Sequence, residues 1–279
     1  RREGDRQAEN DLDEAPEATP DANAQAGIRV ELQTVPVDGF DLPVKLVFPS
    51  DFDPNKKYPI LFNVYGGPRS QSVRNFYQDF TNDDQLAQGL IKVTFDHRGS
   101  GLFGRQGLDQ MHRQLGKWEI SDLIAVVKAL EKETYVDPER VGIQGGSYGG
   151  YYTALALTAG AGYITHGIAS FPVTDWRLYD NIYTERYMDT PQENPDGYDA
   201  GSVMTYADQL KGRLLIIHGT ADDNVHVQNS LQLIDKLEDL DKPFEMMFYP
   251  GERHGWGGPK RKHSQALSER FWSMFLGAR

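Results

Sequence analysis

The patterned part of the chain begins with alternating apolar and polar positions. Residues 28–37 and 41–48 flank Asp38-Gly39, a dipeptide typical of tight turns, and together they predict a β-hairpin. Further along, short apolar runs alternate with longer segments whose apolar residues recur every three or four positions. The short runs predict strands at 58–64, 90–95, 141–144, 167–170, 213–219 and 244–249, and the longer segments predict helices at 79–88, 118–131, 151–157, 227–240 and 264–276.

This order of elements predicts the fold class. A hairpin followed by strands that alternate with helices is typical of an α/β protein with a mostly parallel central sheet and helices on both faces. Right-handed crossovers place the carboxyl ends of parallel strands along one edge of the sheet. Functional sites of open α/β sheets form at that edge. Reactive side chains are therefore expected in the loops that follow the strands.

The first 27 residues lack such a pattern. Asp, Glu, Ala, Pro and Asn dominate residues 1–27, and Leu12 is the only large apolar residue there. A segment of this composition cannot bury enough apolar surface to order itself. The sequence therefore predicts a disordered acidic N-terminal tail or linker over residues 1–27 and one folded domain over residues 28–279.

Composition narrows the classes of function. The chain has 279 residues, of which 25% are charged and 39% apolar, as in soluble globular proteins. Its net charge of -12 argues against a nucleic-acid-binding surface. The absence of cysteine excludes disulfides, a thiolate nucleophile and a cysteine-ligated metal site. No apolar run approaches the ~20 residues of a membrane-spanning helix, and no His or carboxylate pair has metal-binding spacing.

One pentapeptide carries the clearest chemical signal. Gly145-Gly146-Ser147-Tyr148-Gly149 matches G-x-S-x-G and lies between the strand predicted at 141–144 and the helix predicted at 151–157. Strand, tight turn and helix form the context of a nucleophile elbow, in which a strained backbone lifts the serine hydroxyl out of the sheet edge. Neighbouring side chains would collide there, which explains the flanking glycines. We predict Ser147 as a nucleophile.

A serine hydroxyl needs a base that is oriented by an acid. Asp222 and Asp223 follow the strand predicted at 213–219, and His254 follows the last predicted strand. The order Ser, Asp, His is that of the α/β-hydrolase fold. Spacing alone does not choose between the two aspartates, and it leaves His218 and His226 open as bases. The remaining histidines are expected to be solvated: His97, His112, His166 and His263.

An oxyanion hole is the third requirement. The backbone N–H of Tyr148, directly after the nucleophile, is one expected donor. The second donor should come from the loop after an early strand, where the phenol of Tyr65 could donate.

Several longer motifs carry a family resemblance. They resemble the catalytic domain of the prolyl oligopeptidase family, and most closely its dipeptidyl peptidase IV branch, from about residue 28 to the C-terminus. The matching segments are 65–71 (YGGPRSQ), 96–101 (DHRGSG), 145–151 (GGSYGGY), 183–188 (YTERYM) and 218–226 (HGTADDNVH). The resemblance implies an α/β-hydrolase catalytic domain over residues 28–279.

The resemblance also implies roles for particular residues. Ser147 would be the nucleophile, Asp222 the acid and His254 the base, with Tyr65 and the Tyr148 amide as oxyanion donors. The implied activity is that of a serine peptidase that cleaves after proline or alanine through an acyl-enzyme, with no cofactor and no metal. The implied S1 pocket for the P1 residue is formed by Tyr148, Val173, Trp176, Tyr179, Tyr183, Asn224 and Val225. The residues alone favour a core role for this aromatic cluster.

The chain departs from the family pattern at two positions. Gly146 replaces a bulkier residue, which predicts a looser back of the elbow, and His97 replaces a glycine. Family members also carry a β-propeller, which in the dipeptidyl branch grips the free amine of the substrate. No run of propeller strands is present in this sequence, so the choice between exopeptidase and endopeptidase stays open.

Three further expectations concern the activity, the location and the oligomeric state. The same scaffold suits a serine esterase or acylaminoacyl-type hydrolase, and it also suits a non-catalytic binding module. The family resemblance favours a periplasmic or secreted location, although no signal peptide begins the sequence. Relatives dimerise through C-terminal helices, so Phe271, Trp272 and Phe275 form either a homodimer contact or a face that packs on the chain's own sheet.

Overall fold

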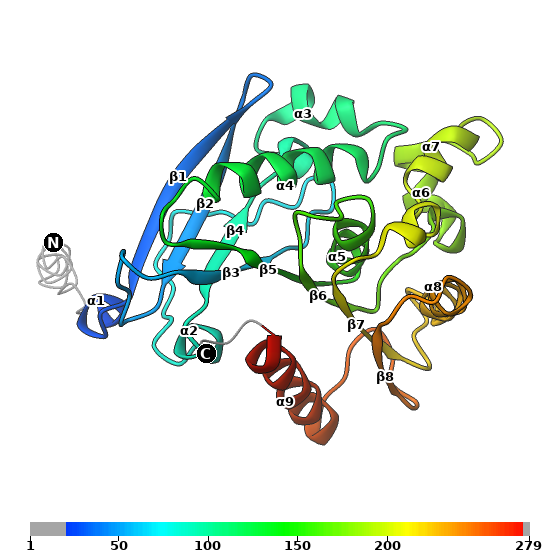
Figure 1. Ribbon diagram of the computed structural model, residues 1–279. Helices are drawn as coiled ribbons and strands as arrows, with labels where there is room; N and C mark the ends of the chain where they lie inside the picture. The colour runs from blue at the N-terminus through cyan, green and yellow to red at the C-terminus, as the bar shows by residue number, and fades with distance from the viewer. Residues whose placement is uncertain (1–20, 276–279) are drawn as a thin grey trace, which may run out of the picture.

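The computed structural model describes residues 21–275 of the chain (Figure 1). Residues 1–20, which make up most of the predicted tail, lie outside the described residues. The short helix α1 (Ala22–Gln25) precedes the expected domain boundary at residue 28. Its Asn23 is buried, donates to Gln78 O at 2.7 Å and accepts from Phe80 N at 2.8 Å. The described fold therefore includes residues just before that boundary.

The described residues form one eight-stranded sheet in the order β1-β2-β4-β3-β5-β6-β7-β8. β1 pairs with β2 and β2 with β4 in antiparallel fashion, and all other pairs are parallel. This confirms the predicted hairpin and the mostly parallel sheet. The strands are β1 (Arg29–Val37), β2 (Phe40–Phe48), β3 (Tyr58–Asn63), β4 (Ile91–Phe95), β5 (Val136–Gly146), β6 (His166–Ser170), β7 (Arg213–Gly219) and β8 (Glu245–Tyr249).

Helices cover both faces of the sheet, as predicted (Figure 1). The helices α4 (Lys117–Leu130), α5 (Tyr148–Thr158) and α8 (Gln228–Asp239) share one apolar cluster, and α9 (Gly258–Phe275) belongs to a second cluster. Side chains that alternate along β3 supply both clusters, since Phe62 belongs to the first and Leu61 to the second. Both faces of the central strands are thus buried, which explains their continuous apolar runs.

Other elements differ from the sequence-based expectation. The helix expected over residues 79–88 is shorter: α2 (Asp84–Ala87) begins after Asp83, whose carboxylate accepts from the backbone N–H groups of Gln85 and Leu86. Several short elements were not predicted, because they show no sustained apolar periodicity. They are η2 (Arg98–Ser100), α3 (Gly104–Met111), η3 (Trp176–Leu178), α6 (Asn181–Met188), α7 (Pro195–Ala200) and η4 (Val203–Gln209). All three residues of η2 are nevertheless buried.

The apolar face of α9 packs on the chain's own sheet. Phe271 and Trp272 are buried with Leu61, Ile168 and Ile217. The indole Nε1 of Trp272 also donates to Gln144 Oε1 at 2.7 Å. These two side chains therefore belong to the core of this chain, whereas the side chain of Phe275 lies outside the described residues. Among residues 21–275, no helix is long and apolar enough to cross a membrane.

A buried ion pair holds the hairpin, the β4–α3 connection and α4 together. Arg98 is 2% exposed, and its guanidinium contacts the fully buried Asp122 at 2.6 Å. It also contacts Asp38 in the hairpin turn at 2.9 Å and lies 4.1 Å from the centroid of the Trp118 ring. A buried guanidinium that loses its carboxylate is left without compensation for its lost hydration.

We expect Asp122→Ala to lower the free energy of unfolding by about 3–5 kcal/mol, because the buried guanidinium of Arg98 then keeps only the exposed carboxylate of Asp38 as its ionic partner. Asp38→Ala removes a carboxylate that is 65% exposed, so it should cost about 1 kcal/mol or less. Urea unfolding followed by circular dichroism measures both changes. Equal losses in the two variants would contradict this account of the ion pair.

His166 lies on β6 and is half-buried, contrary to the expectation that it is solvated. Burial, with a smaller effect of Arg213, lowers the pKa of His166 to about 4. The unfolded chain therefore binds a proton at a higher pH than the folded chain does. The stability that the neutral imidazole contributes is present above about pH 6.5 and is lost as the pH falls towards 4.

In His166→Gln, the free energy of unfolding should fall less steeply than in the wild type between pH 6.5 and pH 4. Urea midpoints at a series of pH values measure this slope. His226→Gln removes an exposed imidazole and should follow the wild type. A slope unchanged by His166→Gln would show that this imidazole does not couple folding to pH.

Candidate active site

Ser147 occupies a strained turn between β5 and α5. Its backbone has φ 59° and ψ -118°, a conformation that is sparsely populated for residues with a side chain. Two hydrogen bonds hold the turn: Ser147 N donates to Ser170 O at 3.0 Å, and Tyr151 N donates to Ser147 O at 3.0 Å. The segment has the predicted order of strand, tight turn and helix.

Close backbone contacts explain the glycines that flank Ser147. A Cβ added at Gly145 or at Gly149 would lie 2.4 Å from the carbonyl oxygen of Val64, at the end of β3. Such a distance is far below van der Waals contact, and the opposing atom is backbone. The elbow can therefore approach β3 only with glycine at both positions, as predicted.

At Gly146, the expectation of a looser elbow is wrong. A Cβ added there would lie 2.7 Å from Cε2 and 2.8 Å from Cζ of Phe171. The ring of Phe171, which follows β6, fills the space beside this glycine. No sequence signal links these two positions, which are far apart along the chain.

Asp222 and His254 meet at the same edge of the sheet, in the loops after β7 and β8. His254 Nδ1 lies 2.8 Å from Asp222 Oδ2. The other oxygen, Oδ1, accepts from the backbone N–H groups of Asn224 and Val225 at 3.0 Å each. The side chain of Asp222 is fully buried and that of His254 is 22% exposed. The carboxylate thus holds one edge of an imidazole that still reaches the surface.

The neighbouring candidates are engaged elsewhere, although His218 Nε2 also lies 3.3 Å from Asp222 Oδ2. Asp223 is 62% exposed and pairs with Arg253 at 2.7 Å. His218 is buried, with Nδ1 at 2.7 Å from Ser230 Oγ and Nε2 at 2.8 Å from Val225 O. Burial lowers the pKa of His218, so this imidazole stays neutral beside the carboxylate. His226 is exposed. Geometry therefore favours the pair Asp222 and His254 over the alternatives.

Tyr65 follows β3 and lies beside the elbow. Its side chain is 45% exposed, and its ring centroid is 6.3 Å from that of Tyr148. Partial burial, together with the nearby Tyr187, raises the pKa of Tyr65. The phenol therefore keeps its proton at neutral pH and can donate a hydrogen bond.

His97 is buried, so the expectation that it is solvated is wrong. Its Nδ1 accepts from Gly99 N at 3.1 Å, and its Nε2 lies 2.8 Å from Gly66 O, to which it donates in that tautomer. His97 thus ties the segment that carries Tyr65 to the loop after β4. Its departure from the family pattern was the one signal that this position is unusual.

The four aromatic residues expected to line the S1 pocket lie together. The Trp176 ring lies 5.2 Å from Tyr148 and 6.1 Å from Tyr183, and Tyr183 lies 5.5 Å from Tyr179. Tyr179 Oη donates to Asn224 Oδ1 at 2.9 Å. Tyr148, Val173, Trp176 and Val225 are buried, whereas Tyr179 and Tyr183 are half-buried and Asn224 is exposed. The cluster therefore belongs to the core on one side and reaches solvent on the other.

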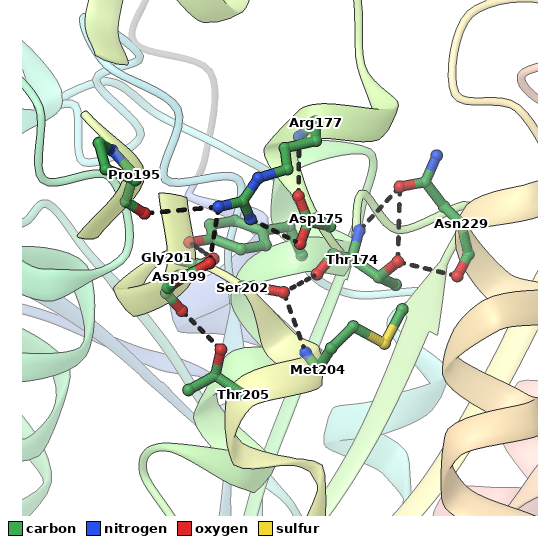
Figure 2. Close-up of polar contacts among 11 residues, drawn as sticks. Thr174, Asp175, Arg177, Pro195, Asp199, Gly201, Ser202, Met204, Thr205 and Asn229 are labelled. Carbon is green, nitrogen blue, oxygen red and sulfur yellow. Dashed lines mark hydrogen bonds and ion pairs between the residues drawn. The ribbon is translucent and has the colours of Figure 1, made fainter. Parts of the chain in front are cut away.

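A polar network supports the segment that carries Val173 and Trp176 (Figure 2). Thr174 N donates to Asn229 Oδ1 at 3.0 Å, and Thr174 Oγ1 donates to Asn229 O at 2.8 Å. Arg177 contacts Asp175 at 3.3 Å and Asp199 at 2.6 Å. The aromatic cluster is thus fixed to α8 on one side and to α7 on the other.

Sequence reasoning missed the fully buried Glu119 on α4. It accepts a hydrogen bond from Tyr148 Oη through Oε1 and one from Gly116 N at 3.0 Å through Oε2. Burial raises the pKa of this carboxyl group. Glu119 thus fixes the hydroxyl end of the Tyr148 side chain. The only sequence signal was a carboxylate on the same helical face as the apolar Leu123 and Val126.

Over residues 21–275, no group of three His, Cys, Asp or Glu side chains could hold a metal ion. The arrangement of Ser147, Asp222 and His254 at one sheet edge suits nucleophilic catalysis by a serine.

Comparisons with known proteins agree with this arrangement. Residues 78–277 match the Prolyl oligopeptidase family. The chain is 47% identical over 228 residues to a protein of Coccidioides posadasii (strain C735) named "Probable dipeptidyl-aminopeptidase B". The match covers 80% of this chain and 25% of that protein. A protein of the same name from Emericella nidulans is 46% identical over 226 residues, with the same coverage of 80% and 25%.

A solved structure is similar over most of the chain. The crystal structure of Porphyromonas gingivalis dipeptidyl peptidase 4 matches with a TM-score of 0.84 and 40% sequence identity. The match covers 88% of this chain and 35% of that one. The two dipeptidyl-aminopeptidases are longer still, and the chain spans about a quarter of the length of these curated relatives. The fold is the predicted α/β-hydrolase fold, and the chain belongs to the prolyl oligopeptidase family.

Proposed function

We propose that this chain is the catalytic domain of a dipeptidyl-peptidase-like serine peptidase, which hydrolyses peptide bonds after proline or alanine through an acyl-enzyme on Ser147. The observation that carries the proposal is the contact between His254 Nδ1 and Asp222 Oδ2 at the sheet edge where Ser147 adopts its strained turn. The names of the relatives, which are dipeptidyl-aminopeptidases and a dipeptidyl peptidase, support the substrate class.

In the first step, Ser147 Oγ attacks the carbonyl carbon of the scissile bond while His254 Nε2 takes its proton. Asp222 accepts from His254 Nδ1, keeps the imidazole in the tautomer whose Nε2 is free to accept, and stabilises the imidazolium that forms. The two backbone N–H groups on Oδ1 keep the carboxylate turned towards the imidazole.

The tetrahedral intermediate carries a negative oxygen that needs donors. The Tyr148 N–H, at the first turn of α5, and the protonated phenol of Tyr65 serve this role. Collapse of the intermediate breaks the C–N bond, and His254 returns the proton to the leaving amine. Water then attacks the acyl-enzyme with His254 as base, and the proton passes back to Ser147 Oγ as the acid product leaves.

The aromatic cluster suits a small apolar P1 side chain. Tyr179 and Tyr183 are only half-buried and lie against the buried Trp176 and Tyr148. The flat faces of aromatic rings suit a pyrrolidine ring, and an apolar wall offers little to a charged side chain. This surface supports the proposal of proline or alanine at P1.

Ser147→Ala should lower kcat on glycyl-prolyl-p-nitroanilide by about 10⁴-fold or more, because no other group supplies the attacking oxygen. Release of p-nitroaniline measures the rate, and circular dichroism checks the fold. Turnover of an N-acetylated substrate, compared with that of the free amine, shows whether this domain by itself requires a free N-terminus. Wild-type turnover in a folded Ser147→Ala variant would refute the proposal.

The two neighbouring aspartates provide a matched pair of variants. Asp222→Asn should lower kcat by about 10³–10⁴-fold, because the amide cannot hold the tautomer and the charge that His254 needs. Asp223→Asn should stay within about twofold of the wild type, because its carboxylate faces Arg253 in solvent. The same p-nitroanilide assay compares them. The acid is misassigned if the Asp223 variant loses more activity than the Asp222 variant.

A further inference from the structure

Phe171 has a backbone conformation that its side chain does not favour. It follows β6 with φ 38°, a region in which bulky residues are outliers. Strain of this kind persists only where the surrounding structure imposes it, and it gathers at functional sites. Two hydrogen bonds surround the residue: Phe171 N donates to Ile217 O on β7 at 2.6 Å, and the preceding Ser170 O accepts from Ser147 N at 3.0 Å. The strained segment therefore joins β7 to the elbow.

The ring of Phe171 lies between the elbow and the imidazole of His254. On one side, its edge occupies the space that a side chain at Gly146 would need, with ring carbons 2.7 Å and 2.8 Å from an added Cβ. On the other side, its centroid is 4.5 Å from that of His254, at an interplanar angle of 57°. The Trp256 ring packs against it at 5.5 Å and 75°. Aromatic contacts at these separations stabilise a defined arrangement.

The hydrogen bond to Asp222, taken alone, leaves the imidazole of His254 free to tilt. A single hydrogen bond at Nδ1 fixes one edge of the ring but allows the ring to tilt about that contact. A tilt moves Nε2, the atom that must meet Ser147 Oγ. The loop that carries His254 is tied to the loop after β7 by Ala221 N, which donates to Glu252 O at 2.9 Å, and by the Arg253–Asp223 pair, but neither contact touches the imidazole. The Phe171 ring, whose centroid lies 4.5 Å from that of the imidazole, restricts this tilt, and Trp256 in turn packs against Phe171.

We propose that Phe171 is a positioning residue, which transmits the position of the elbow backbone at Gly146 to the imidazole of His254 and so sets the direction of Nε2. This inference rests on the proposed roles of Ser147 and His254. It explains why glycine precedes the nucleophile in this chain: a side chain at that position would displace the ring that orients the base.

Two single variants and their combination test the coupling. Phe171→Ala should lower kcat on glycyl-prolyl-p-nitroanilide by about 10–100-fold with KM within about twofold, because misplacement of a catalytic group slows the chemical step. Gly146→Ala should lower kcat by about tenfold in the wild type, because the new methyl group pushes the Phe171 ring into His254. In the Phe171→Ala background the same change should cost less than about twofold, because the obstructing ring is gone.

Phe52→Ala is the matched control. Phe52 is also half-buried among aromatic rings, with centroids of Phe48 and Tyr58 at 4.7 Å and 5.1 Å, but it lies at the far end of the sheet. It should lower the melting temperature and leave kcat unchanged. If Phe171→Ala fails to fold, Phe171→Leu takes its place in the cycle, because leucine keeps apolar volume but clears part of the space beside Gly146.

The outcomes distinguish a failure of this inference from a failure of the proposed active site. If Ser147→Ala abolishes turnover but Gly146→Ala costs the same in both backgrounds, Phe171 does not position the base, and only this inference is overturned. A loss of kcat in Phe171→Ala no larger than in Phe52→Ala overturns it as well. If turnover survives Ser147→Ala, the proposed active site itself is wrong.

Discussion

The close approach of the β5–α5 turn to the end of β3 is the constraint on which the site depends. Both Gly145 and Gly149 face the carbonyl oxygen of Val64, and neither position has room for a Cβ. This contact forces the chain to reverse within one residue, and Ser147 takes the strained conformation of that reversal. It also places Tyr65, which directly follows Val64, beside the residue that follows the nucleophile. One backbone contact thus positions the proposed nucleophile and both proposed oxyanion donors.

The remaining parts of the site are brought together by the parallel sheet. In the register of the strands, Gly146 pairs with Ser170, Ser170 with Ile217, and Gly219 with Tyr249. The loops after β5, β6, β7 and β8 therefore begin side by side, although they are far apart in the sequence (Figure 1). Asp222 and His254 meet because their strands are neighbours. Phe171 reaches both the elbow and His254 because β6 lies between β5 and β7.

The features that the sequence predicted well are those with local causes. The hairpin, the buried strands and the elbow each carry their pattern within about ten residues, so residue order alone identifies them. Features that depend on distant contacts were missed. His97 and Glu119 are polar residues whose burial depends on partners elsewhere, Gly66 and Tyr148 respectively. Spacing alone did not choose between Asp222 and Asp223, because the choice depends on which side chain turns inward, and only the family resemblance pointed to Asp222. The helices α6 and α7 were missed because they bury few apolar residues.

The central claim is that Ser147 is an activated nucleophile, and reaction with a fluorophosphonate tests it most directly. The folded protein is treated with the probe, digested, and mapped by mass spectrometry. The account predicts a single adduct, on the hydroxyl of Ser147, that does not form after heat unfolding. A folded protein that takes up no label, or one labelled on a different serine, would contradict it.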